Sequence, residues 1–81
     1  MREYQENICN AVVKKQDWIG NNTSVTTING VTKVIYYRTE IARVNHAAKS
    51  ATFDNGGYTN ASTTARINAV KDACKELGYN Y

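Results

Sequence analysis

The chain has 81 residues, with ten Lys or Arg against seven Asp or Glu and a net charge of +3. A chain of this length forms one small domain and buries only about 60% of its unfolded surface. Its two cysteines exclude a dense disulfide framework of the secreted kind. The first twenty residues carry charges throughout, so we expect no signal peptide, no transmembrane segment and a reducing cytoplasm.

Apolar residues recur every three or four positions at the start of the chain, which is the period of one helix face. Gly20 follows this pattern and is a plausible stop for a helix. We therefore predict a helix over residues 1–20. Its stripe consists of Tyr4, Ile8, Ala11, Val12, Lys15 and Ile19.

Asn29-Gly30 separates two β-rich runs, residues 23–28 and 31–37. Both positions of a two-residue hairpin turn need a positive φ, so an Asn-Gly pair is a strong hairpin signal. A two-residue loop pairs Ile28 with Val31 and sets the whole register. That register places Val25, Val34 and Tyr36 on the predicted core face, and Ile28, Ile35 and Tyr37 on the other.

After a short turn at Arg38-Thr39, residues 40–45 and 50–53 are predicted as two further strands. The alternation within 40–45 is imperfect. Either Ile41 and Arg43 or Ala42 and Val44 face the core, and the pattern leaves the register open.

The segment Asp54-Asn55-Gly56-Gly57 is typical of a turn, because Asp and Asn side chains bond their own backbone and Gly accepts left-handed conformations. Ser62, Thr63 or Thr64 is expected to cap a helix over residues 62–78. The expected apolar stripe of this helix is Ile67, Val70, Cys74 and Leu77, widened by Ala69 and Ala73. Arg66, Lys71 and Lys75 are expected to lie in water.

Together these elements predict a single α+β domain over residues 1–81. A helix precedes a four-stranded antiparallel meander over 23–58, and a second helix follows. Each helix has one apolar stripe, so both are expected to cover the same face of the sheet. The other face keeps Ile28, Ile35 and Tyr37 exposed, which favours a homodimer or a partner surface.

The motif Gly56-Gly57-Tyr58, followed by Thr63-Thr64-x-Arg66-Ile67-Asn68, resembles the pattern of a family of small phage and prophage accessory proteins. The resemblance extends over about residues 23–77. It implies a phage origin and action in the cytoplasm of the infected bacterial host. Small proteins of this kind are often inhibitors of bacterial defence, such as anti-CRISPR proteins, and this step is an analogy.

The residue pattern gives no catalytic or metal-binding motif. His46 is the only histidine, and a lone His in a strand connection is usually solvated. Cys9 and Cys74 fall on or beside helical stripes and are interpreted as small buried hydrophobes, with a disulfide between them left open. We therefore expect no enzyme activity, no cofactor and no metal.

Two features are candidates for function. Hydroxyl groups, free N–H groups and an arginine at a helix start form an anion site, which would comprise Thr63, Thr64 and Arg66 with Tyr58 nearby. Tyrosines beside arginines on the sheet fit either a protein interface or a surface that stacks bases.

The preferred hypothesis is a non-catalytic inhibitor of a host protein or ribonucleoprotein complex. The expected contact residues are Tyr37, Arg38, Arg43, Arg66, Lys71 and Lys75. The alternative is a nucleic-acid- or nucleotide-binding module that uses the Thr63-Thr64-Arg66 helix start. Neither hypothesis involves a membrane, and both allow a homodimer.

Overall fold

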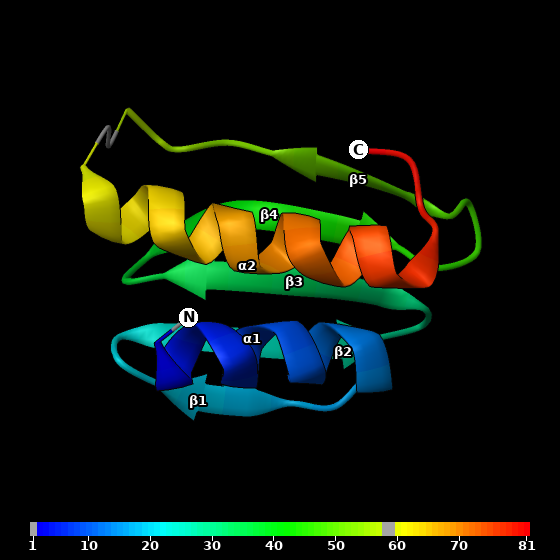
Figure 1. The fold of residues 1–81 in the computed structure, drawn as a ribbon, viewed down its shortest axis with the longest axis horizontal. Helices are drawn as coiled ribbons and strands as arrows, with labels where there is room; N and C mark the ends of the chain where they lie inside the picture. Colours follow the sequence, from blue (N-terminus) through cyan, green and yellow to red (C-terminus); the bar gives the residue numbers. More distant parts are fainter. Residues whose placement is uncertain (1, 58–59) are drawn as a thin grey trace.

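The chain forms two layers, a pair of helices and an antiparallel sheet that they cover (Figure 1). The computed structural model describes residues 2–57 and 60–81. The helices are α1 (Glu3–Lys14) and α2 (Ala61–Leu77). The strands are β1 (Trp18–Gly20), β2 (Thr23–Ile28), β3 (Val31–Tyr36), β4 (Thr39–Asn45) and β5 (Ser50–Phe53).

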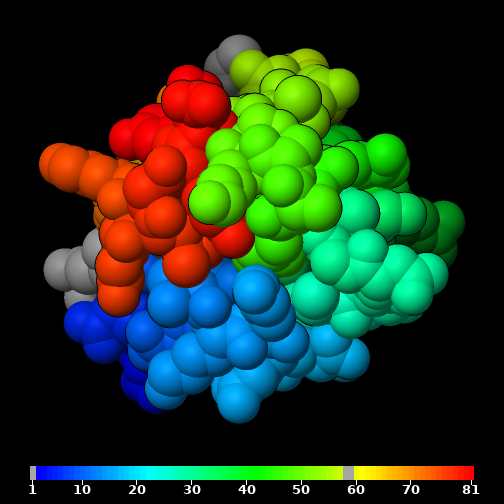
Figure 2. Space-filling model, turned by 90° about the vertical axis from the view of Figure 1, so that its right-hand side faces the viewer, coloured from blue at the N-terminus to red at the C-terminus, as the bar shows by residue number. Residues whose placement is uncertain are grey.

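The five strands form a meander in chain order, β1-β2-β3-β4-β5, and all neighbouring pairs are antiparallel. Helix α1 packs over β1 and β2, whereas α2 packs over β4 and β5, and the two helices contact each other. Both helices lie on the same side of the sheet, as the side view shows (Figures 1 and 2). The α+β class and the order of helix, sheet and helix are therefore confirmed.

The prediction of four strands is wrong, because residues 18–20 form a fifth strand instead of the end of the first helix. Lys15 caps the end of helix α1. It has a φ of 56°, and its backbone N–H donates to the carbonyls of Ala11 and Val12. Asn21 and Asn22 then adopt φ values of 51° and 60°, which suit a two-residue hairpin turn. Gly20 is no helix stop: a Cβ there would approach the Trp18 ring to 2.7 Å.

The central hairpin has the predicted register. Ile28 pairs with Val31, Thr27 with Thr32 and Val25 with Val34 across the Asn29-Gly30 turn. The following turn consists of Tyr37 and Arg38 rather than Arg38 and Thr39, because Tyr36 pairs with Thr39.

A β-bulge in β4 resolves the register that the alternation left open. Val34 pairs with Ala42 and Ile35 with Glu40, so Ile41 is an extra residue without a partner. A bulge lets two successive residues share a face. Ile41 and Ala42 are accordingly both buried, and Arg43 points the other way.

The core lies between the helices and the inner side of the sheet. Its fully buried side chains include Ile8, Val12, Val25, Val34, Ile41, Val44, Val70 and Cys74. The chain after α2 then runs beside β5, where Asn80 exchanges backbone hydrogen bonds with Lys49 and Ala51. No helix in the described residues has the length and apolar character needed to cross a membrane.

Candidate binding face

One side of the sheet carries no helix, and we call it the open face. Its residues alternate with the buried ones along each strand. They include Ile19 on β1; Ser24, Thr26 and Ile28 on β2; Val31, Lys33 and Ile35 on β3; Glu40, Arg43 and Asn45 on β4; and Thr52 on β5, with Tyr37 and Arg38 in the β3–β4 turn. Ile19 is 84% exposed, and Ile28 and Tyr37 are each 64% exposed.

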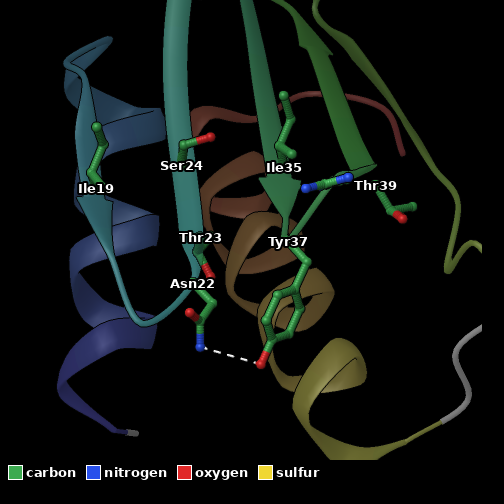
Figure 3. A pocket seen from close by; sticks show the side chains of 8 residues that line it. Ile19, Asn22, Thr23, Ser24, Ile35, Tyr37 and Thr39 are labelled. Carbon is green, nitrogen blue, oxygen red and sulfur yellow. Dashed lines mark hydrogen bonds between the residues drawn. The ribbon is translucent and has the colours of Figure 1, made fainter.

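A first hollow of about 490 Å³ lies on the open face near the β3–β4 turn. Ile19, Ser24 and Ile35 project into view from three neighbouring strands, and the helices lie behind the sheet (Figure 3). The Asn22 amide donates to the Tyr37 hydroxyl at 3.3 Å, which positions the tyrosine ring at one end of the hollow (Figure 3). Arg38 contributes the only charged side chain among the described residues that line it.

Tyr37 has a φ of 57°, a left-handed conformation that bulky residues rarely adopt. Its backbone N–H donates to the Asn22 carbonyl at 2.8 Å. Since the side chain bonds the same residue, Asn22 restrains Tyr37 from both the backbone and the ring. The aromatic side chain is therefore exposed yet restrained.

A second hollow of about 370 Å³ lies farther along the same two strands. It is lined by Thr26, Ile28, Asn29, Val31, Lys33 and Arg43. Its two cations, Lys33 and Arg43, share the lining with two aliphatic side chains, Ile28 and Val31. A third hollow, of about 340 Å³, adjoins β5 and differs in charge, because Glu40 and Asp54 line it together with Arg43. The Arg43 guanidinium donates to both Glu40 carboxylate oxygens, at 3.1 and 3.2 Å.

Arg66 lies in the interior, so the expectation of an exposed arginine is wrong. Only 5% of it is exposed. Its guanidinium lies between the rings of Tyr4 and Tyr36, at 4.5 and 4.1 Å from their centroids. It donates to Thr23 Oγ1 at 2.7 Å, and to the carbonyls of Asn21 and Ser62, each at 2.9 Å. These groups join α2 to α1 and to the β1–β2 turn.

The six expected contact residues do not share a surface. Tyr37, Arg38 and Arg43 lie on the open face. Lys71 and Lys75 belong to α2 in the opposite layer. The Nζ atom of Lys71 lies 5.4 Å from the centroid of the Phe53 ring. Arg66 is buried between the two layers and cannot contact a partner while the domain is folded.

The start of α2 lacks the features of the expected anion site. The helix cap is Asn60, whose side chain accepts from the Thr63 N–H at 2.9 Å, rather than Ser62, Thr63 or Thr64. Thr63 is fully buried, and Arg66 is directed inward. Tyr58, the fourth residue of that site, lies outside the described residues. Among the three described residues of the expected anion site, Thr63, Thr64 and Arg66, Thr64 is the one that is exposed.

His46 is buried, although it was expected in solvent, and is only 8% exposed. Its Nε2 lies 2.7 Å from Thr32 Oγ1, and its Nδ1 lies 3.0 Å from the Tyr79 hydroxyl. Burial lowers the pKa of His46, and Lys15 lowers it further. The side chain thus connects β3 to the segment that follows α2.

Cys9 and Cys74 are both buried free thiols. Burial raises the pKa of each, and Glu76 and Asp72 add to the rise at Cys9. A raised pKa disfavours the reactive thiolate. Within residues 2–57 and 60–81, no group of three His, Cys, Asp or Glu residues is arranged to hold a metal ion.

The model of one protein family matches the chain over residues 1–80, and its description is Kyanoviridae Gp96 protein. The chain belongs to this family. The expectation of a small phage protein is therefore confirmed. A search of the curated proteins and a search of the solved structures each give no significant match.

Membership of the Gp96 family supports a phage origin. Within the described residues, Ile19, Ile28 and Tyr37 of the open face are the most exposed large hydrophobic side chains. The sequence interpretation missed Ile19 as part of that face and Asn22 as part of the first hollow, because it assigned both to the end of a helix or the break after it. The signal was present in Asn21-Asn22, two residues of a type that tolerates positive φ, followed by the β-branched run of β2.

Proposed function

We propose that this phage protein is a non-catalytic binding protein that inhibits a host defence protein or complex through its open face. The single observation that carries the proposal is the exposure of Ile19, Ile28 and Tyr37 on a sheet face that no other described element covers. Large exposed apolar patches with a polar rim are typical of protein interaction sites. A phage protein meets host proteins, and an anti-CRISPR-like inhibitor is the most specific form of the proposal.

The Tyr37 region adds a second support. Tyr and Arg are enriched at protein interfaces, and Tyr37 and Arg38 stand side by side at the first hollow. Backbone strain such as the left-handed φ of Tyr37 concentrates at ligand clamps and switch regions. A side chain already restrained by Asn22 loses less conformational entropy when a partner binds.

Replacing Ile19 tests the proposal. The Ile19→Gln variant removes apolar area without adding charge, at a side chain that is already 84% exposed. We expect an unchanged thermal melt and at least about tenfold weaker capture of a host defence protein, the scale of an interface anchor. The assay is co-purification from host cells that carry a defined defence system, combined with a measurement of that system's activity against phage.

Lys75→Gln is the matched control, because Lys75 is exposed on α2 in the other layer. It should leave both capture and inhibition unchanged. The proposal fails if Lys75→Gln weakens capture as much as Ile19→Gln, or if the wild-type chain leaves every tested defence system fully active.

A further inference from the structure

Charge differs along the open face. The first hollow contains Arg38 and no carboxylate, and the second contains Lys33 and Arg43 and no carboxylate, among the described residues that line them. Both acidic side chains of the three hollows, Glu40 and Asp54, line the third. The two hollows along β2 and β3 thus each contain aliphatic side chains and are exclusively cationic at their charged positions among the described residues.

The cations differ in how far they are already neutralised. Arg43 forms a salt bridge with Glu40. Lys33 and Arg38 form none within residues 2–57 and 60–81. An occupant of the two hollows would therefore meet two uncompensated positive charges, and carboxylates on that occupant would be attracted to them.

The two hollows lie on the same strand pair. Val31 lines the second hollow and Ile35 the first, and both belong to β3. Four residues of strand separate them, or about 13 Å at roughly 3.3 Å per residue. The same distance separates apolar residues four positions apart in an extended segment, or about eight apart in a helix with a rise of roughly 1.5 Å.

We propose that the open face binds an acidic protein segment with two apolar anchors, one in each hollow along β2 and β3. The inference deepens the proposed function and rests on it. The carboxylates of the segment pair with Arg38 and Lys33, and its anchors pack on Ile35 and Val31. A second copy of this chain fits poorly, since cations would then oppose cations across a two-fold interface.

Nucleic acid fits the floor of these hollows less well than protein. Single-strand binders stack successive bases on aromatic side chains. Tyr37 is the sole aromatic residue lining either hollow in the described part of the chain, and the other uncharged lining residues are Ile, Val, Ser, Thr and Asn. Aliphatic side chains beside uncompensated cations suit apolar side chains flanked by carboxylates.

The test uses a displayed library of random peptides about 16 residues long, which spans the two hollows even as a helix. The full chain is the bait. Selected peptides should be rich in Asp and Glu and carry two apolar residues four or about eight positions apart. Raising NaCl from about 0.05 M to 0.3 M should weaken their binding several-fold, because salt screens exposed charges.

Charge reversal separates this inference from the proposed function. The Lys33→Glu/Arg38→Glu double variant should lose at least about tenfold in affinity for the selected peptides. Lys75→Glu, on α2, should change that affinity by less than about twofold, since distant exposed charges are screened. If a captured host protein depends on Ile19 but not on Lys33 and Arg38, the proposed function stands and the acidic-segment inference is overturned.

Three other results would also overturn the inference. Selected peptides could show no excess of acidic residues. A labelled single-stranded oligonucleotide could bind with an affinity that the double variant abolishes. Sedimentation could show a dimer that the Ile19→Gln variant dissociates, which would mean that a second copy covers the open face.

Discussion

The buried guanidinium of Arg66 contacts side chains and carbonyls from α1, α2, β2, β3 and the β1–β2 turn, whereas the exposed Arg43 contacts Glu40 in its own strand. It donates three hydrogen bonds to oxygen atoms of α2 and of the segment around the β1–β2 turn, and two tyrosine rings cover its faces. Buried charge is costly unless hydrogen bonds satisfy it. Here neutral oxygens and aromatic faces, rather than a carboxylate, provide the compensation.

Arg66→Ala should destabilise the fold by about 3 kcal/mol, because it leaves buried oxygens without donors and a void between two rings. Arg66→Lys should recover only part of that loss, since one ammonium cannot reproduce the planar fork. Urea unfolding measures both. Arg43→Ala is the control and should cost less than about 1 kcal/mol, as expected for an exposed ion pair. Equal costs at the two arginines would refute the structural role of Arg66.

The buried imidazole of His46 should make stability depend on pH. Its folded-state pKa lies below the ordinary value of 6.5, because burial and then Lys15 disfavour the charged form. Between pH 6.5 and that lowered pKa, the unfolded chain binds more protons than the folded chain. The free energy of unfolding should therefore fall as pH drops through this window and be fully present above it.

Thermal or urea unfolding at several pH values checks this expectation. His46→Asn removes the titrating group, so the difference in stability between wild type and variant should shrink as pH falls below 6.5. Carboxylates titrate in both proteins and cancel in that difference. A difference that stays constant across the window would show that His46 does not sense pH.

At the scale of elements, the ends of helices and strands are set by backbone geometry that composition specifies only loosely. Lys15 takes the left-handed position at the end of α1, where glycine is usual. At the start of α2, four polar residues are candidates for the cap, namely Asn60, Ser62, Thr63 and Thr64, and Asn60 occupies that position. Its extended backbone, with a φ of −78° and a ψ of 165°, directs the amide oxygen at the Thr63 N–H.

Asn60→Ala should therefore cost about 1 kcal/mol of stability, the usual loss for an N-cap. Ser62→Ala should cost almost nothing, since Ser62 lies within the first turn of α2 and is exposed. Urea unfolding of both variants shows which of the two residues, Asn60 or Ser62, caps the helix. A larger loss for Ser62→Ala would restore the cap expected from the sequence pattern.

At the scale of the whole molecule, one face of the sheet is buried under the helices and the other is exposed to solvent. Val25 is fully buried under the helices, whereas Ile28, three residues later on the same strand, is 64% exposed. Helix α1 precedes the sheet in sequence and α2 follows it, and the two helices pack side by side on one face. The other face therefore has no helix over it. The open face is the side of the sheet that the described helices leave exposed.

The two sides predict different costs for similar substitutions. Val25→Thr is nearly isosteric but buries a hydroxyl, and should destabilise the protein by about 2 kcal/mol. Ile28→Thr should stay within about 0.5 kcal/mol of wild type, as is usual for exposed positions. Urea unfolding of the pair tests the assignment of faces. A loss at Ile28 comparable to that at Val25 would mean that the open face is covered in solution.

The sequence by itself determined the elements with strong local signals. Asn29-Gly30 set the register of the β2–β3 hairpin, because few residues accept the two positive φ values of that turn. Helical periodicity placed Ile8, Val12, Val70 and Cys74 in the core, and α2 ends at Leu77, one residue before the predicted bound at residue 78. The uncovered face with Ile28 and Tyr37 followed from the same register.

Tertiary structure decided what depends on contacts distant in sequence. Residues 18–20 have helical spacing with α1, but pairing with β2 makes them a strand. The bulge at Ile41 arises from packing two neighbouring apolar residues on one face. Arg66 and His46 look like surface residues in the sequence and are buried. Apart from Ser62, their hydrogen-bond partners lie between 14 and 45 residues away in the chain. Such pairings leave no local pattern.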